Sequence, residues 1–343
     1  MNQTHNPRDT PPQSLERNMT KRAETPSNAS KTALVTGASS GLGFEAAAQL
    51  AQEGFGRVIV TARTMEKAEI AVRALSKRTR MDVFRPAAVD LSILTTVDEF
   101  ADQLRDRQER IDFLLLNAGL VSGPTPKFNA EGVESTFAAS VVGHHLLTVR
   151  LLNDGALSPH ARIIISGSEA ARNDVPMMSL DDIPAFAAEA TGGDLVEAMR
   201  RIAKAQGPGK FNPNNAYANA KAFVAWWAAA LSRKLPAGMT VNAVSPGSAP
   251  DTNALRNVPW PMRVMMTLMM KYVGRFFGMA GSVKQAARRY IDATTYDDTL
   301  TGIFFASPAG KLVGPVEVQR QDHILHRPSQ DAAYQAVVSL AGG

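Results

Sequence analysis

The 343-residue chain contains no cysteine. Disulfide bonds, thiolate metal sites and cysteine nucleophiles are therefore excluded. The six histidines are scattered, and neither close pair, His144 with His145 or His323 with His326, has further ligand candidates at a zinc-like spacing. We therefore expect no metal site.

The chain also lacks an uncharged apolar run of about 18 residues, the length that a membrane-spanning helix requires. Its N-terminus has no apolar core of the kind that a secretory signal contains. The formal net charge of +5 is modest and does not indicate nucleic-acid binding. We expect a soluble cytoplasmic protein without a nucleic-acid partner.

Large apolar residues are scarce in residues 1–30, so we predict a disordered N-terminal tail. From residue 31, short apolar runs alternate with longer segments of helical spacing. This alternation predicts one α/β domain over 31–343, built as a single Rossmann-type, doubly wound parallel sheet with helices on both faces. Ser329 is expected to cap a last helix. The expected strands are 32–36, 57–61, 83–89, 113–116, 162–166 and 240–244, and the expected helices include 43–53, 64–78, 93–109, 131–152 and 216–234.

Residues 33–50 read as a strand, a glycine-rich turn and a helix. Three glycines, Gly37, Gly41 and Gly43, punctuate the turn. Glycines at such a turn allow a tight bend, a close approach of the backbone to a pyrophosphate, and packing of the helix against the strand. The N–H groups at the helix N-terminus favour an anion. The stretch therefore predicts a dinucleotide site.

The second strand ends near Arg63, about 20 residues after the glycine turn, where a dinucleotide site reads the adenosine ribose. An arginine suits a 2′-phosphate, so we favour NADP(H) over NAD(H); the alternative is a solvated charge at a strand end. After the third strand, Asp90 and Leu91 either meet the adenine or cap a helix that begins near Ser92.

Asn117-Ala118-Gly119 follows the fourth strand, where small residues either let a cofactor approach or form an ordinary turn. Further along, Tyr217 and Lys221 are four residues apart in a predicted helix, on one face. A nearby ammonium should lower the tyrosine pKa from about 10 and make the hydroxyl a usable proton donor or acceptor. The pair is informative because it follows the glycine turn and four strands.

These motifs, in this order, resemble the short-chain dehydrogenase/reductase superfamily over about residues 31–310. The insert 170–214, residues 137–147 and Thr301-Gly302-Ile303-Phe304-Phe305 resemble its subgroup of retinol dehydrogenases and protochlorophyllide reductases. The matching motifs are Thr36-Gly37-Ala38-Ser39-Ser40-Gly41-Leu42-Gly43, Asn117-Ala118-Gly119, Tyr217 with Lys221, and Ser245-Pro246-Gly247.

The resemblance implies that Tyr217 exchanges a proton with the substrate oxygen while a hydride moves to or from the nicotinamide. Lys221 would bind the nicotinamide ribose and lower the tyrosine pKa. A serine at the end of the fifth strand would stabilise the substrate oxygen; alignment favours Ser168, with Ser166 as the alternative.

The resemblance also implies that Pro246 and Gly247 shape the nicotinamide pocket. Ser140 stands where the family often has an asparagine that organises a water near the lysine, and a hydroxyl can also hold a water. The absence of cysteine argues against the photochemical reduction of the protochlorophyllide reductases.

Two stretches lie outside the regular pattern. Residues 170–214 are expected to wall the substrate cleft, or else to be a surface excursion. Residues 253–285 contain no acid and are rich in methionine and basic residues, in the place where this family has its substrate lid. We interpret them as a lid for a bulky lipophilic substrate; the alternatives are a membrane-contacting helix, core packing or an oligomer contact.

The combined prediction is an NADP(H)-dependent oxidoreductase that interconverts a carbonyl and an alcohol on a medium-to-large apolar substrate. A sensor or scaffold that binds NADP(H) without turnover is the first alternative. A C=C reductase or an epimerase on the same fold is the second. Homo-oligomers are a further expectation, because helices beside the later strands often pair subunits in this family.

Overall fold

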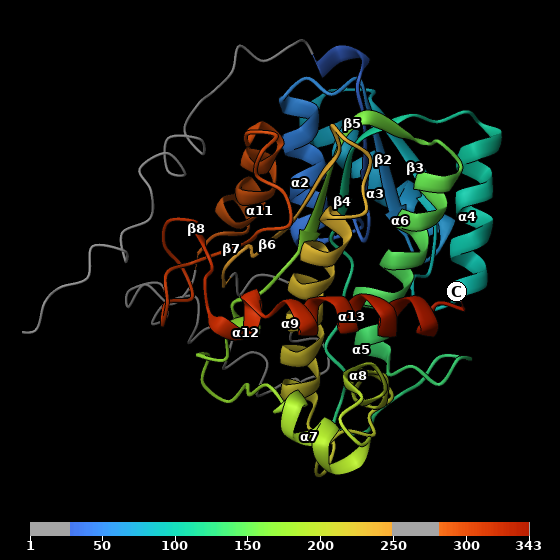
Figure 1. Ribbon diagram of the computed structural model, residues 1–343. Coiled ribbons are helices and arrows are strands. Elements are labelled where there is room, and N and C mark those ends of the chain that lie inside the picture. Colours follow the sequence, from blue (N-terminus) through green and yellow to red (C-terminus); the bar gives the residue numbers. More distant parts are fainter. Residues whose placement is uncertain (1–27, 249–280, 343) are drawn as a thin grey trace, which may run out of the picture.

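The computed structural model describes residues 28–248 and 281–342 (Figure 1). Its strands are β1 (Thr32–Val35), β2 (Arg57–Ala62), β3 (Phe84–Ala88), β4 (Ile111–Leu116), β5 (Leu157–Ser166), β6 (Thr240–Val244), β7 (Phe304–Ala306) and β8 (Glu317–Val318). Its helices are η1 (Asn28–Ser30), α2 (Gly41–Gln52), α3 (Met65–Thr79), α4 (Leu94–Asp106), α5 (Ser135–Phe137), the π-helix η2 (Ala138–Val142), α6 (Gly143–Asn153), η3 (Glu169–Arg172), α7 (Ile183–Ala190), α8 (Leu195–Ala203), α9 (Pro213–Ser232), α11 (Val283–Asp292), η6 (Ala293–Thr295), α12 (Asp322–Leu325) and α13 (Arg327–Leu340).

The strands form one eight-stranded sheet in the order β3-β2-β1-β4-β5-β6-β7-β8. Its pairings are parallel except that of β7 with the edge strand β8, which is antiparallel. The strand order reverses between β1 and β4, and ligands of such sheets bind beyond the carboxyl ends of the strands at this switch point. The turns after β1 and β4 are therefore placed where a cofactor site is expected.

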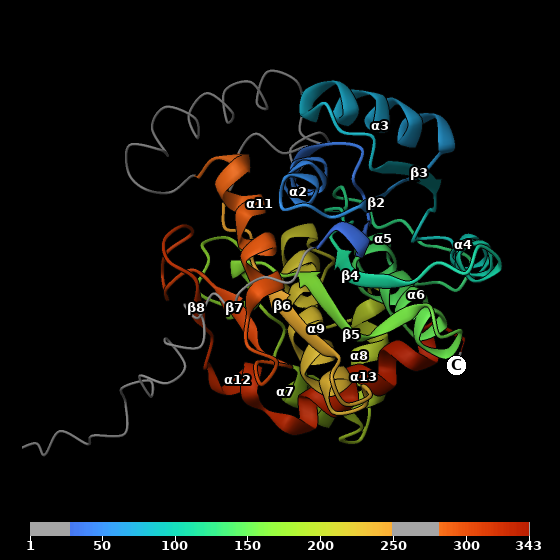
Figure 2. The same ribbon diagram turned by 90° about the horizontal axis from the view of Figure 1, so that it is seen from above.

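Helices cover both faces of the sheet, as Figure 2 shows from above. Helices α2, α3 and α11 lie on one face, and α4, α6 and α9 lie on the other. Each face has its own apolar core, because the strands are buried on both sides. The predicted doubly wound α/β fold is confirmed, apart from the antiparallel edge strand.

The C-terminal helix α13 adds a further layer outside the second face. It lies across α9 and also contacts α8 (Figure 1). Ser329 is not its cap, because the helix begins two residues earlier, at Arg327, and the serine hydroxyl lies 2.8 Å from Nδ1 of His326.

Other sequence-based boundaries also differ from the structure. Residues 28–30, placed in the predicted tail, form η1, and Asn28 donates a hydrogen bond to the carbonyl of Glu53. The helix predicted over 131–152 is divided into α5, the π-helix η2 and α6. The fifth strand begins five residues before its predicted start, at Leu157.

The insert 170–214 begins within η3, contains α7 and α8, and ends in the first turn of α9. Residues 253–280 of the predicted lid lie outside the described residues, and 281–285 lead into α11. Within 28–248 and 281–342, no helix combines the length and apolar content that crossing a membrane requires.

Candidate active site

The glycine turn after β1 packs tightly against the segment after β4. Gly37 has a φ of +63°, and a Cβ there would lie 3.0 Å from both Cα and Cβ of Ala118. A Cβ on Gly43 would lie 2.6 Å from both Asn117 Nδ2 and the carbonyl oxygen of Gly37. Side chains are therefore excluded from two positions of the turn by their neighbours.

Thr36 joins the same two segments by hydrogen bonds. Its Oγ1 accepts from the backbone N–H groups of Asn117, at 2.8 Å, and of Ala118, at 3.0 Å. In return, Asn117 Nδ2 donates to the Thr36 carbonyl at 2.9 Å. The structure thus brings the predicted cofactor turn and the predicted Asn-Ala-Gly motif, which ends at Gly119, into one unit.

The start of α2 has the features that an anion site needs. Gly41 has a φ of +59°, and the space where its Cβ would stand holds no atom of the described residues within 4 Å. The first turn of α2 contains no acidic residue, and Ser40 makes no side-chain capping bond to it. Leu42 packs against the apolar core, and Ser39 is half-buried in the turn. A pyrophosphate therefore fits the geometry and charge of this helix N-terminus.

Arg63 is exposed directly after β2, and Thr64 caps α3 beside it. Asp90 forms a local turn, since its Oδ1 accepts from the N–H and the hydroxyl of Ser92, at 3.0 and 2.6 Å. The helix begins later than expected, at Leu94. The side chain of Leu91 is buried in the core, so a ligand contact at this position would be made by its backbone.

Tyr217 and Lys221 lie one turn apart on α9, and Lys221 Nζ stands 5.6 Å from the centre of the tyrosine ring. The hydroxyl of Tyr217 is hydrogen-bonded to Ser168, the residue that caps η3. Lys221 Nζ donates to the carbonyl of Ser166 at 2.7 Å. The predicted serine, tyrosine and lysine therefore meet at the carboxyl end of β5.

The two candidate serines have different surroundings. The hydroxyl of Ser166 is buried and lies 2.8 Å from the hydroxyl of Tyr290, on α11. Ser168 is half-buried and faces Tyr217. This arrangement leaves Ser168 as the serine that stands beside the tyrosine hydroxyl.

The pKa of Tyr217 is raised from its ordinary value, which is opposite to the direction expected from a neighbouring ammonium. Burial is the main cause; the hydrogen bond from Ser168 lowers the pKa, and the negative charge of Glu169 raises it further. Burial also lowers the pKa of Lys221, to about 8. At neutral pH the pair therefore consists of a neutral phenol and an ammonium.

Ser140 lies beside this pair, within the π-helix η2. Its hydroxyl is buried and has no hydrogen-bond partner among the described residues. A Cβ on Gly119 would lie 3.0 Å from Ser140 Oγ and 4.0 Å from Lys221 Nζ, so both groups border the same glycine. An unpartnered buried hydroxyl at this place suits a bound water or ligand.

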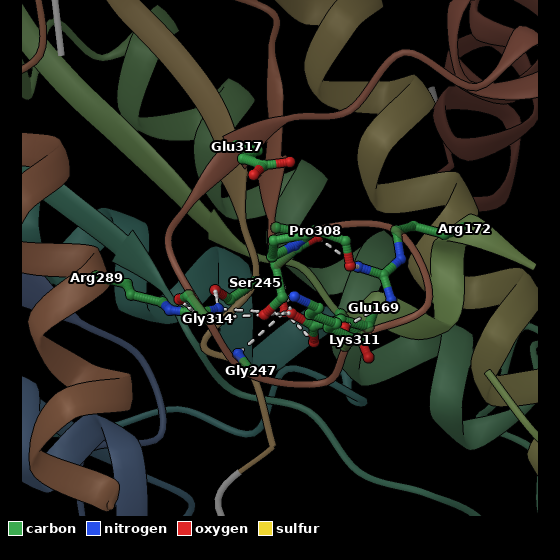
Figure 3. A network of polar contacts seen from close by, with 12 residues as sticks. Glu169, Arg172, Ser245, Gly247, Arg289, Pro308, Lys311, Gly314 and Glu317 are labelled. Atoms are coloured by element: carbon green, nitrogen blue, oxygen red, sulfur yellow. Dashed lines mark hydrogen bonds and ion pairs between the residues drawn. The ribbon is translucent and has the colours of Figure 1, made fainter. Parts of the chain in front are cut away.

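The sequence reasoning missed a buried charge cluster behind Ser168, shown in Figure 3. Glu169 accepts hydrogen bonds from the hydroxyl of Ser245, at 2.5 Å, and from the N–H and hydroxyl of Ser307, at 3.2 and 2.9 Å. Arg289 lies 3.5 Å from the same carboxylate and donates to the carbonyls of Ser245 and Gly314. In the sequence, the local sign of this cluster is Glu169, an acidic residue that stands between the small residues Ser168 and Ala170.

The cluster connects the loops that follow β5, β6 and β7. Arg172 donates to the carbonyls of Ser307, Pro308 and Lys311, and also pairs with Asp174 (Figure 3). Gly247 has a φ of +76° and lies so close to Arg289 that a Cβ would be 2.9 Å from its Nη1.

Pro246 stands between Ser245 and Gly247, whose N–H donates to the Ser245 hydroxyl. The predicted nicotinamide turn, at Pro246 and Gly247, is therefore fixed on buried charged groups.

The insert attaches to α9 on either side of Tyr217. The N–H of Ser179 donates to Asn215 Oδ1, at 3.1 Å. Asp181 exchanges two hydrogen bonds with Asn219, one through its N–H at 3.0 Å and one through its carboxylate at 2.8 Å. Since these asparagines lie two residues before and after the tyrosine, the insert borders the site.

Comparisons with known proteins agree with this geometry. A family model described as short chain dehydrogenase matches residues 31–180. Retinol dehydrogenase 13 from Homo sapiens is 33% identical over 221 residues, which cover 64% of this chain and 59% of that protein. Protochlorophyllide reductase from Avena sativa is 30% identical over 269 residues, which cover 74% of this chain and 83% of that protein.

A crystal structure of a protein from Mycobacterium paratuberculosis shares the fold, with a TM-score of 0.65 at 21% sequence identity. The match covers 92% of this chain and 95% of that chain.

Proposed function

Because the chain belongs to the short-chain dehydrogenase/reductase family, we propose that it is an NADP(H)-dependent oxidoreductase that interconverts a carbonyl and an alcohol. The observation that carries the proposal is the contact of Ser168, Tyr217 and Lys221 at the carboxyl end of β5. A hydroxyl that is held between a hydrogen-bond donor and an ammonium is suited to proton exchange with a substrate oxygen.

In the reducing direction, bound NADPH supplies the hydride. Tyr217 donates its proton to the carbonyl oxygen, and its raised pKa keeps that proton in place at neutral pH. When the substrate is bound, Ser168 turns its one hydroxyl proton from Tyr217 to the same oxygen and stabilises the negative charge that develops there. In the oxidising direction, Tyr217 must first lose its proton, so the rate should rise with pH.

Lys221 is proposed to hold the nicotinamide ribose. One of its three ammonium protons is bonded to the Ser166 carbonyl, which leaves two for the ribose hydroxyls. Ser140 is proposed to hold a water beside Lys221, since its buried hydroxyl has no partner among the described residues. The remaining cofactor contacts are assigned to the turn from Gly37 to Gly43, to Asp90 and Leu91, to Asn117, Ala118 and Gly119, and to Pro246 and Gly247.

Arg63 is proposed to select NADP(H) by binding the adenosine 2′-phosphate. Its exposure after β2, near the N-terminus of α3, supports this role. Loss of one charge-assisted contact of about 1.5–3 kcal/mol should weaken NADPH binding about 10- to 100-fold in R63A, and should leave NADH binding unchanged. R73A, which removes an exposed arginine of α3, is the matched control. Fluorescence titration of both cofactors measures the difference; equal effects on NADPH and NADH would contradict the assignment.

The substrate is proposed to be medium-to-large and apolar. The two relatives described above act, by their names, on retinol and protochlorophyllide, which are both large and mainly apolar. The protein is also proposed to be cytoplasmic, which cell fractionation can test.

The decisive experiment is Tyr217→Phe, tested by NADPH oxidation over a panel of apolar aldehydes and ketones. The variant should lose turnover and should bind NADPH nearly as the wild type does, because only the proton donor is removed. Tyr296→Phe, at another buried tyrosine, is the matched control and should remain active. Turnover by Y217F would refute the proton donor. Wild-type protein that binds NADPH and turns over none of these carbonyls would favour the sensor.

A further inference from the structure

His144 is a buried titratable residue that the proposed mechanism does not use. It lies in the first turn of α6 and is 1% exposed. Its Nδ1 is 3.1 Å from the carbonyl oxygen of Ser140, and its Nε2 is 2.9 Å from Oγ1 of Thr36. The ring therefore spans the distance between the cofactor turn and the π-helix η2.

The partners of the ring determine where its proton lies. A carbonyl oxygen can only accept, so Nδ1 must carry the proton that is donated to Ser140. Nε2 then accepts from the hydroxyl of Thr36 at 2.9 Å and is closer to that hydroxyl than its other acceptor, the Leu115 carbonyl, at 3.4 Å. The Thr36 oxygen itself already accepts two backbone N–H groups. The histidine is thus a neutral ring in the Nδ1–H form with a defined partner on each nitrogen.

Each partner belongs to a different part of the proposed site. Thr36 connects the glycine turn to the segment after β4. Ser140 places its hydroxyl next to Gly119, at the edge that Lys221 Nζ also borders. The ammonium of Lys221 is close enough to the ring to act on its titration, although burial is the larger effect.

We propose that His144 is a positioning residue that couples the cofactor turn at Thr36 to the π-helix at Ser140. The π-helix is a backbone geometry that occurs often at functional sites, and here a side chain holds its central carbonyl. By fixing that carbonyl, His144 orients the Ser140 hydroxyl toward the space beside Lys221. The role rests on the proposed function, because it concerns the cofactor and the lysine named there.

Two substitutions separate the two bonds of the ring. In His144→Asn, the shorter amide can reproduce the donor at Nδ1 and loses the contact with Thr36. In His144→Gln, the longer amide can reproduce the acceptor at Nε2 and loses the bond to Ser140. One buried hydrogen bond of about 1–1.5 kcal/mol corresponds to a change of about 10-fold.

We expect one variant to weaken NADPH binding and the other to slow turnover. H144N should raise the Kd for NADPH about 10-fold, measured by fluorescence titration, with kcat near that of the wild type. H144Q should leave the Kd unchanged, lower kcat about 10-fold and shift the pH dependence of kcat. His145→Asn is the matched control, because His145 is 4% exposed and is bonded to Trp227 instead, so it should alter stability alone.

A second measurement does not depend on turnover or on a variant that folds. ¹⁵N NMR of the wild-type protein should show the His144 ring as neutral and protonated at Nδ1, with signals that shift when NADPH is added. A His144 ring protonated at Nε2, His144 signals that do not change with NADPH, or variants that change stability alone would overturn the proposal. Protein that binds NADPH without turnover would refute the proposed enzyme and leave the Kd and NMR results to decide on His144. Protein that does not bind NADPH would refute both.

Discussion

Replacing Glu169 by glutamine or by alanine should separate the charge of this buried side chain from its hydrogen bonds. Its Oε1 accepts from Ser307 and Arg289, and its Oε2 accepts from the hydroxyl of Ser245. Glutamine keeps Oε1 as an acceptor, and its amide can donate to the Ser245 hydroxyl. Alanine removes every one of these contacts.

The magnitudes follow from the burial of both partners, since Glu169 is 4% exposed and Arg289 is 9% exposed. E169A leaves a buried arginine without its carboxylate, and this should lower the free energy of unfolding by about 3–5 kcal/mol. E169Q loses only the charge-assisted part of the hydrogen bonds and should cost about 1.5–3 kcal/mol.

Urea unfolding measures the free energy, and the pH dependence of alcohol oxidation measures the effect on Tyr217. Burial is the main cause of the raised pKa of Tyr217, and the charge of Glu169 raises it further. Because E169Q removes that charge, the pKa should fall, and the rise in oxidation rate should move to lower pH.

Glu134→Gln is the matched control, because Glu134 is 0% exposed and is bonded to Ser122 and Thr136. It should cost stability without moving the pH profile. A cost of E169A below about 1 kcal/mol, which is the range of a surface ion pair, would refute this role of Glu169. The same pH profile for E169Q and E134Q would also refute it.

Two further predictions concern acid stability and the glycine turn. Burial lowers the pKa of His144 to about 3 and that of His145 to about 4, below the ordinary value of 6.5, so this contribution to stability is complete above pH 6.5 and declines as the pH falls. The free energy of unfolding, measured in urea, should be lower at pH 5 than at pH 7 by about 2 kcal/mol for each ring. Because H145N removes one of the two rings, it should show about half of the combined loss. A free energy that does not change with pH would contradict this. In the turn, G43A should cost about 1–3 kcal/mol by overpacking against Asn117, whereas G41A should cost about 1 kcal/mol for its backbone conformation and weaken NADPH binding, measured by unfolding and by titration. If G41A and G43A had equal effects on NADPH binding and on stability, the space beside Gly41 would not be the place where the cofactor binds.

The parts of the fold that depend on local pattern could be predicted from the sequence. The strand at 240–244 has the bounds that its apolar residues predict, although it also buries Thr240 and Asn242. The π-helix at 138–142 could not be predicted, since the spacing of apolar residues specifies a helical face and does not specify the hydrogen-bond register.

The electrostatics of the site could be predicted less well from the sequence, because they depend on which distant residues come together in the fold. The direction of the Tyr217 pKa shift was predicted wrongly from the proximity of Lys221, since the sequence does not reveal how much burial opposes the tyrosinate. The partners of Glu169 are 76 to 138 residues away along the chain, so no local motif points to them. The roles of Ser168, Ser140 and Arg63 remain predictions that the variants above can test.

Ser248 and Gly281, the two residues that border 249–280, lie side by side in the described fold. The N–H of Gly281 donates to the carbonyl of Ser248 at 2.7 Å, and the N–H of Ser248 donates to Leu312 at 2.8 Å. The two residues that border 249–280 therefore meet at one point, beside the turn at Pro246 and Gly247. Because the entropy of closing a loop grows only slowly with its length, a change in the number of residues between Ser248 and Gly281 should cost the described fold little stability.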